Sequence, residues 1–176
     1  MRSIIAFAGL KKSGKTTLAK RLAVILAVPM ASFGDQVRKE ALRRGLANAS
    51  DKDLQTLGSE LVKTNAKRFC QAVLDDADFQ PGQGLILDGI RHVEIIPVIE
   101  VLTGAKTLSL IYVESSISDR KRRSSLTDRE LAEIDSHLVE RDAPLLKSKA
   151  DLVLDTSAHG DQSFIRLLRW VEQGSD

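Results

Sequence analysis

Hydrophobic residues follow two alternating patterns along the chain. Short, mostly apolar runs stand at 4–8, 30–33, 85–88, 108–113 and 151–155. Such runs are typical of strands that are covered on both faces of a parallel sheet. Between them, apolar residues recur at helical spacing, which indicates amphipathic helices. Strands that alternate with helices predict an α/β fold of three layers, with helices on both faces of a parallel sheet of about five strands.

The longest helical stretch lies between two of these strands, over residues 34–80. A brief helix is predicted to end at Gly45, and Ser50 with Asp53 has the spacing of a capping box at the start of a long second helix. We interpret this pair as a small helical insertion. Further helices are predicted from Lys15 to Leu26, from Val93 to Leu102 and from Phe164 to Val171, with a charged helical region over 118–141.

Composition predicts a single domain over residues 1–176. Apolar residues make up 43% of the chain, which is enough for one core. The 26 lysines and arginines exceed the 24 acidic residues by only two, so the net charge favours neither nucleic acid nor a membrane surface as a partner. Any bound anion must be held by local chemistry, and we expect a monomer or a homodimer.

The sequence also bears on the compartment. The single cysteine, Cys70, excludes an internal disulfide and fits a reducing environment. The opening apolar run is shorter than the core of a signal peptide and lacks a cleavage site. No stretch reaches the roughly 20 apolar residues that span a bilayer. We expect a soluble protein of the cytoplasm.

The segment from Gly9 to Thr16 matches the pattern G-x-x-x-x-G-K-[ST] in full and lies between a predicted strand and a predicted helix. Gly9 and Gly14 let the backbone turn its N–H groups toward a phosphate, Lys15 reaches the β and γ oxygens, and Thr16 offers a hydroxyl to Mg²⁺. The alternative is an ordinary strand-to-helix turn. The pattern predicts a P-loop NTPase fold and an ATP site that Lys12, Ser13 and Thr17 complete.

Asp88 ends an apolar run, where a carboxylate can hold Mg²⁺ or its water across from the P-loop. The alternative is that Asp88 caps the next helix. The histidines His92, His137 and His159 are scattered, and no cysteine, histidine or carboxylate cluster has metal-ligand spacing. We interpret the histidines as structural.

Two short segments resemble the nucleoside monophosphate kinases. Gly34-Asp35-Gln-Val-Arg38 looks like the G-D-x-x-R segment of adenylate kinase and its relatives, and Asp88-Gly-Ile-Arg91 resembles their D-G-x-x-R segment with one position missing. The resemblance implies that Arg38 and Arg91 clamp the acceptor's phosphate. A guanidinium fork matches phosphate oxygens two at a time. Alternatively, either arginine is a surface residue paired with a nearby glutamate.

Residues 118–123, Ser-Asp-Arg-Lys-Arg-Arg, are similar to the lid of these kinases, which implies a lid region over 115–141. The resemblance implies that Arg120 and Arg123 neutralise the transferring group, with Arg141 as a third candidate. The alternative is a solvated basic helix face. Residues 150–157 are similar to the last strand and loop of dephospho-coenzyme-A kinase and of phage deoxynucleoside monophosphate kinases, where this loop packs beside the adenine.

These features lead to three hypotheses. In the first, the protein moves the γ-phosphoryl group of MgATP to a nucleoside or deoxynucleoside monophosphate, and no general base is needed. In the second, the acceptor is a hydroxyl group, as in dephospho-coenzyme-A kinase, and Asp35 takes its proton. In the third, the protein is a nucleotide-dependent ATPase or switch without a small acceptor. We prefer the first because two arginines, Arg38 and Arg91, follow the two acidic motifs.

Overall fold

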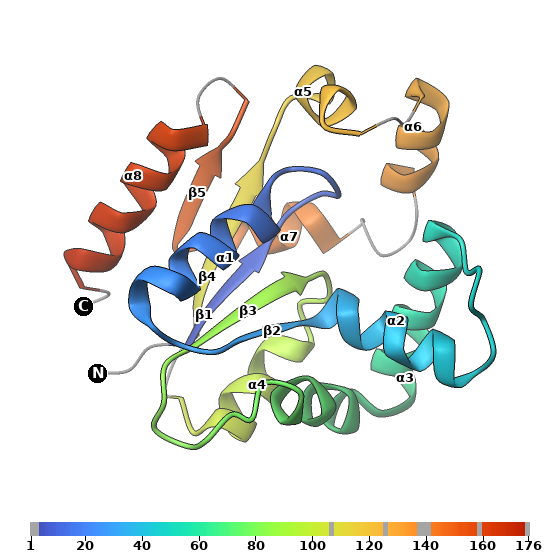
Figure 1. Cartoon of the computed structure of the whole chain (residues 1–176), viewed down its shortest axis with the longest axis horizontal. Coiled ribbons are helices and arrows are strands. Elements are labelled where there is room, and N and C mark those ends of the chain that lie inside the picture. The colour runs from blue at the N-terminus through green and yellow to red at the C-terminus, as the bar shows by residue number, and fades with distance from the viewer. Residues whose placement is uncertain (1–3, 106–107, 125–126, 137–141, 158–159, 175–176) are drawn as a thin grey trace.

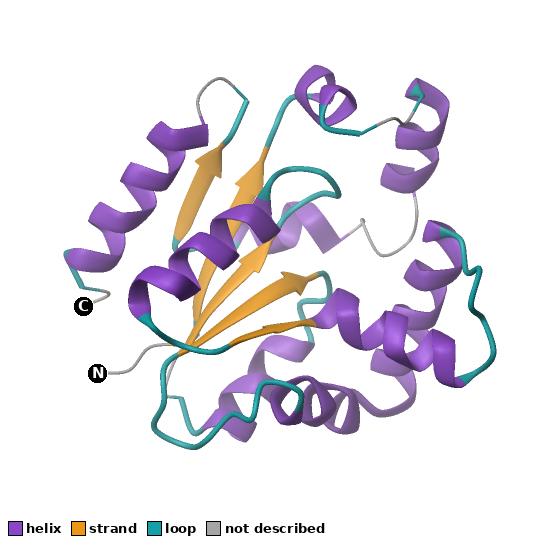
Figure 2. Ribbon diagram, in the orientation of Figure 1, coloured by secondary structure: helices purple, strands orange, loops and turns teal. Residues whose placement is uncertain are grey.

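The structure is a computed structural model that describes residues 4–105, 108–124, 127–136, 142–157 and 160–174. Its centre is a sheet of five parallel strands in the order β2-β3-β1-β4-β5. The predicted α/β fold with a parallel sheet is therefore confirmed (Figure 2). The strands are β1 (Ile4–Ala8), β2 (Met30–Ser32), β3 (Leu85–Ile90), β4 (Ser109–Glu114) and β5 (Leu152–Asp155).

The first strand lies in the middle of the sheet. It pairs with β3 on one side and with β4 on the other, although both strands come much later in the chain. The chain therefore crosses from one side of β1 to the other between β3 and β4. In open parallel sheets, ligands bind outside the carboxyl ends of the strands at such a switch point. This topology predicts a site at the carboxyl ends of β1 and β3.

Side chains of β1 alternate between two separate parts of the core. Ile4, Ala6 and Ala8 pack against one helical layer, whereas Ile5 and Phe7 pack against the other. In Figure 1 the first layer extends from behind the sheet to beyond the end of β2, and the second lies in front of the sheet. The first contains α2 (Phe33–Arg43), α3 (Asp51–Asp75), α4 (Ile95–Thr103) and α7 (Ala143–Ser148), and the second contains α1 (Lys15–Leu26) and α8 (Gly160–Glu172).

The helical pair predicted between the second and third strands is α2 and α3. As predicted, Ser50 and Asp53 form a capping box at the start of α3. The helix is kinked at Asn65, whose backbone φ of −163° and ψ of 82° are not helical. Edge-to-face packing of Phe33 on Phe69, with ring centroids 5.5 Å apart, joins the two helices. That this pair acts as an acceptor-binding insertion stays a prediction.

Several predicted boundaries were wrong. Phe33 was placed in a strand, but it begins α2, because the Ser32 side chain caps this helix by accepting a hydrogen bond from the backbone N–H of Asp35. The third strand continues past Asp88 to Ile90, because Gly89 adopts a φ of 90° at the point where the register with β1 shifts. The helix expected from Val93 begins at Ile95.

The charged region predicted as one helical stretch over 118–141 contains two separate helices among its described residues. They are α5 (Ile117–Arg122) and α6 (Asp128–Ser136), and both lie beyond the carboxyl end of β4 (Figure 1). The short helix α7, which begins with Ala143 and Pro144, was not predicted at all. Within the described ranges, every helix is too short or too polar to cross a membrane.

Candidate functional site

The loop that follows β1 contains three residues whose backbone φ angle is positive. Gly9 has a φ of 137°, Lys12 of 66° and Gly14 of 93°. Gly9 also lies so close to β4 that an added Cβ atom would be 2.1 Å from the carbonyl oxygen of Val113. Gly14 is the N-cap of α1 and contributes no side-chain hydrogen bond, so the first amides of α1 have no side-chain cap. Such a helix N-terminus is a ready anion-binding site.

Lys15 is a buried cation in this loop. Only 8% of the residue is exposed, and its Nζ atom donates to the Leu10 carbonyl at 3.2 Å. The pKa of Lys15 is lowered to about 7, mainly by burial and then by the positive charge of Arg91, with the Asp88 carboxylate acting in the opposite direction. A phosphate group next to this ammonium would favour its charged form. The loop therefore has a buried cationic group that a bound anion would stabilise in its charged form.

Asp88 faces the loop from β3. Thr16 Oγ1 donates to Asp88 Oδ2 at 2.7 Å, and only 4% of Asp88 is exposed. The other carboxylate oxygen, Oδ1, is buried without a hydrogen-bond partner among the described residues. A buried carboxylate with an unused oxygen beside a hydroxyl fits Mg²⁺, which prefers oxygen ligands. The alternative role in capping is wrong, because Asp88 lies within β3 and Glu94 is the N-cap of α4.

A cavity of about 530 Å³ joins this loop to the helical pair α2 and α3. Its lining combines charged groups with an apolar wall. The predicted site residues that line it are Lys12, Gly14, Lys15, Thr16, Thr17, Arg38, Asp88, Arg91 and Arg123, and the apolar wall consists of Phe33, Val37, Leu54, Phe69 and Ile95. Gly9, Ser13, Asp35 and Arg120 are predicted site residues outside this lining.

The two arginines expected to bind the acceptor differ in their surroundings. Arg38 is paired with Asp35 one helical turn earlier, and their side chains are 58% and 56% exposed. Its partner is thus an aspartate of its own helix and not a nearby glutamate. Burial lowers the pKa of Arg91, while the carboxylates of Asp88 and Asp51 raise it. Arg91 therefore lies inside the charged centre, and Arg38 lies at its solvent side.

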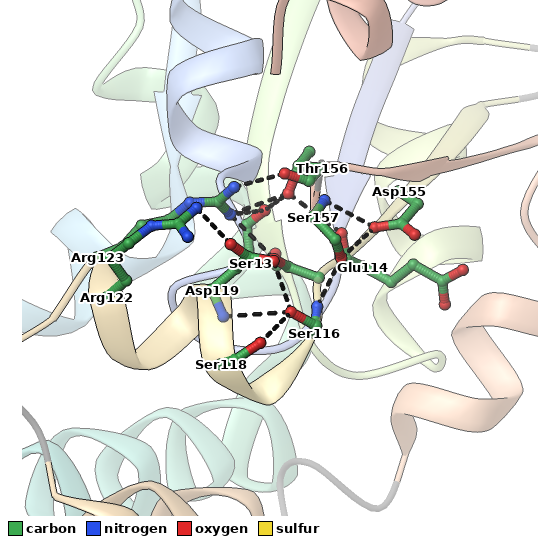
Figure 3. Close-up of polar contacts among 11 residues, drawn as sticks. Ser13, Glu114, Ser116, Ser118, Asp119, Arg122, Arg123, Asp155, Thr156 and Ser157 are labelled. Atoms are coloured by element: carbon green, nitrogen blue, oxygen red, sulfur yellow. Dashed lines mark hydrogen bonds and ion pairs between the residues drawn. The ribbon is translucent and has the colours of Figure 1, made fainter. Parts of the chain in front are cut away.

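The two arginines predicted to belong to a lid also differ. Arg120 is only 1% exposed, its two Nη atoms donate to the Asp135 carboxylate at 2.8 and 2.6 Å, and its Nε atom donates to the Lys11 carbonyl at 2.8 Å. The alternative of a solvated basic face is therefore wrong for Arg120. Arg123 instead donates to Thr156 through both Nη atoms, at 2.9 and 2.5 Å (Figure 3). Arg141 lies outside the described residues.

Sequence reasoning missed the partners of these arginines. Asp135 comes from α6, and Thr156 follows β5 with only 2% of its surface exposed. Thr156 Oγ1 also approaches the Ser13 carbonyl oxygen at 2.7 Å. The signal that could have found Thr156 is its place directly after a strand of a parallel sheet, where polar side chains gather around ligands.

One of the three histidines, His92, lies near two carboxylates. Ligand atoms of His92, Glu94 and Asp142 lie within 4.8 Å of one another, although their spacing in the sequence gave no metal signal. Burial lowers the pKa of His92. Asp142 Oδ2 accepts a hydrogen bond from the backbone N–H of Val93 at 3.4 Å, so the carboxylate already has a structural partner. His137 and His159 lie outside the described residues.

The chain is similar in sequence to known proteins. A family described as an AAA domain matches residues 8–138. A UPF0200 protein of Pyrobaculum aerophilum is 38% identical over 125 residues, which cover 70% of this chain and 65% of the relative. A UPF0200 protein of Methanosarcina mazei is 40% identical over 98 residues, which cover 53% of this chain and 49% of the relative. The chain thus spans less than two thirds of the curated relatives' length.

Solved structures share the whole architecture at low sequence identity. Shikimate kinase from Acinetobacter baumannii, solved with shikimate, has a TM-score of 0.62 at 12% identity and covers 99% of this chain and 96% of its own. Shikimate kinase from Bacteroides thetaiotaomicron has a TM-score of 0.57 at 17% identity, covering 97% and 98%. A sugar kinase from Janibacter has a TM-score of 0.56 at 18% identity, and the match covers 98% of this chain and 95% of the sugar kinase. These likenesses establish the fold.

Proposed function

The chain belongs to the AAA-domain family and has the kinase-like fold of P-loop NTPases, and on this premise we propose that it transfers the γ-phosphoryl group of MgATP to a nucleoside or deoxynucleoside monophosphate. The observation that supports this most is that Arg38 and Arg91 line the same cavity as Lys15. One cavity thus contains cations for two phosphate groups. Location in the cytoplasm and the oligomeric state stay predictions.

On the nucleotide side, the first amides of α1 and the Lys15 ammonium bind the β- and γ-phosphates. Thr16 and Asp88 would hold Mg²⁺, which would supply positive charge to neutralise the phosphates. The transition state of phosphoryl transfer is highly anionic, and catalysis depends mainly on positioning and on fixed positive groups. Lys15 and Arg91 are such groups, since Lys15 is buried and Arg91 is partly buried, and burial reduces the screening by water.

On the acceptor side, a phosphate oxygen is already a nucleophile and requires no base. Arg91 would orient this phosphate beside Lys15, and Arg38 would release Asp35 to bind its outer oxygens. Exposed ion pairs contribute only about 0–1 kcal/mol, so exchanging Asp35 for a phosphate costs little. The apolar wall around Phe33, Val37 and Phe69 would cover the rest of the acceptor and exclude water from the transfer.

A hydroxyl acceptor is the second candidate, because the structures of similar fold include kinases of shikimate and of sugar. Asp35 would then be the general base. It lies in the first turn of α2, next to the cavity-lining residues Gly34 and Arg38. In this case the arginines would bind a negative charge elsewhere on the acceptor, and the Asp35 carboxylate would have to leave Arg38 to take the proton.

The test is a panel of acceptors. MgATP is incubated with ribonucleoside and deoxyribonucleoside monophosphates, with dephospho-coenzyme A and with shikimate, and ADP formation is measured. We expect a monophosphate to raise ADP formation most. With that acceptor, Asp35→Asn should change turnover mildly, whereas Arg38→Ala should lower kcat/KM for the acceptor by about tenfold. A deep loss in Asp35→Asn would favour the hydroxyl acceptor instead, and phosphate release that no small molecule accelerates would favour an ATPase or switch.

A further inference from the structure

One hydroxyl connects the P-loop to the lid arginine Arg123. Thr156 Oγ1 lies 2.7 Å from the Ser13 carbonyl oxygen and 3.2 Å from the Glu114 carbonyl oxygen, and it accepts a hydrogen bond from Arg123 Nη1 at 2.9 Å (Figure 3). A hydroxyl has one proton to donate, and carbonyl oxygens only accept. The shorter distance assigns that proton to Ser13. Thr156 therefore donates to the P-loop and accepts from the arginine.

Within the part of the chain that the structure describes, the groups that accept hydrogen bonds from Arg123 are neutral. They are the hydroxyl and carbonyl of Thr156, the Ser115 hydroxyl at 3.1 Å and the Ser13 carbonyl at 3.4 Å. Arg120, one turn earlier, is instead bound to the Asp135 carboxylate. The guanidinium charge strengthens the hydrogen bonds of both arginines, but the pair of Arg120 with Asp135 adds an attraction between opposite charges that the neutral partners of Arg123 do not supply. A phosphate can therefore take Arg123 from its present partners more readily than it can take Arg120.

Arg123 also lies near the place where such a phosphate would be bound. It lines the cavity, and its Nη1 atom is 3.6 Å from where a Cβ atom on Gly14 would lie. Gly14 is the last residue before α1 and its free amides. The arginine thus needs only a short movement from Thr156 to the bound phosphates.

Movement of Arg123 changes the hydrogen bonds of the Ser13 carbonyl. Ser13 is fully buried, and both Thr156 and Arg123 donate to its carbonyl oxygen. While the Thr156 hydroxyl is present, that oxygen keeps a donor after the arginine has left. Without the Thr156 hydroxyl, Arg123 is the donor of this pair that is left to the Ser13 carbonyl oxygen. Departure of Arg123 would then leave that oxygen without either donor. A buried acceptor that loses its partner is costly.

We propose that Thr156 is a positioning residue that releases Arg123 for phosphoryl transfer by keeping the P-loop carbonyl of Ser13 hydrogen-bonded. This inference rests on the proposed kinase function. It predicts that the hydroxyl affects the catalytic step and leaves nucleotide binding nearly unchanged, because the arginine moves to the transferring group and the P-loop amides bind the nucleotide in either case.

The test compares Thr156→Val, which removes the hydroxyl at nearly constant volume, with Thr156→Ser, which retains it. ADP formation is measured with MgATP and a mixture of the common ribonucleoside and deoxyribonucleoside monophosphates, and MgATP affinity is measured by calorimetry. We expect Thr156→Val to lower kcat by about tenfold, which corresponds to loss of one buried hydrogen bond, with MgATP affinity within about twofold. Thr156→Ser should restore kcat.

The Arg123→Ala background separates positioning from a structural role. Once the arginine is absent, adding Thr156→Val should lower kcat no further. Additive losses in the double variant, or equal loss of kcat and MgATP affinity in Thr156→Val, would show that Thr156 acts on the P-loop itself and would overturn the proposal. Wild-type protein that forms no ADP with any acceptor would overturn the kinase function, whereas an active wild type with unaltered Thr156→Val would overturn only this inference.

Discussion

The two halves of the cavity offer different groups to the phosphates that we propose they bind. On the nucleotide side, backbone amides at the start of α1 work with Lys15 and Asp88, which are 8% and 4% exposed. On the acceptor side, Arg38 and Asp35 form an ion pair with both side chains more than half exposed. Backbone and buried groups hold one geometry, whereas an exposed pair can exchange partners at small cost. The difference suggests that the nucleotide site is rigid and that acceptor choice depends on adaptable side chains.

The largest effect is expected from Lys15→Ala on the nucleotide side. Loss of a buried cation at the transferring group should lower kcat by about 100-fold or more. The fold should survive, because burial already disfavours this charge and lowers its pKa to about 7. ADP formation and thermal unfolding measure the two effects. Lys20→Ala, on the exposed side of α1, is the matched control. Unchanged turnover in Lys15→Ala would remove the ATP site from this loop.

Gly9→Ala tests whether the backbone of the nucleotide half is as constrained as we suggest. The added Cβ atom would meet the Val113 carbonyl at 2.1 Å, and the φ of 137° disfavours any side chain. We expect a loss of about 3 kcal/mol in the free energy of unfolding, measured by chemical denaturation. Gly45→Ala is the control, since its φ of 77° is also positive but nothing lies within 4 Å. It should lose only about 1 kcal/mol. Equal losses would refute the close contact.

Arg91→Ala and Arg38→Ala compare a partly buried with an exposed cation on the acceptor side. We expect kcat/KM for the acceptor to fall by about 100-fold in Arg91→Ala and by about tenfold in Arg38→Ala, because water screens the exposed guanidinium. Steady-state kinetics at saturating MgATP measures both. If Arg38→Ala were the more damaging, the acceptor phosphate would lie on the solvent side of the cavity.

The smallest expected effect is on the pH dependence of MgATP binding. The pKa of Lys15 is about 7 in the free protein, and a bound triphosphate raises it because an anion favours the ammonium. Binding therefore takes up a proton above pH 7, and affinity should fall as the pH rises from 7 toward the pKa of the complex, by at most about tenfold per unit. Calorimetry in buffers of different ionisation enthalpy detects the proton. Lys15→Arg, which stays charged, should show no such uptake, and a wild type without uptake would contradict the lowered pKa.

The features that the sequence predicted correctly are mostly those formed by residues that are adjacent in the chain. The P-loop and the strand that precedes it are contiguous, so the pattern from Gly9 to Thr16 indicated both the fold and the nucleotide site. The strand order and the kink at Asn65 depend on contacts between distant segments, and the sequence did not reveal them. The short helix α7 was missed because six residues show too little periodicity.

Contacts between distant segments also decide the surroundings of the two arginines of the predicted lid. Arg120 and Arg123 are one helical turn apart, and the resemblance to a kinase lid implied the same role for both. Their partners, Asp135 and Thr156, come from different parts of the chain and give the two arginines different surroundings. Only the folded chain shows that one guanidinium is neutralised by a carboxylate and the other is held by neutral oxygens.

The central claim is that the γ-phosphoryl group passes to an acceptor bound in the same cavity. The most direct test follows the labelled γ-phosphoryl group of MgATP by chromatography after incubation with the mixture of nucleoside monophosphates. We predict that the label appears in a nucleoside diphosphate, in equal amount to the ADP formed, and that Lys15→Ala abolishes it. Label found only in inorganic phosphate, whatever acceptor is added, would contradict the account.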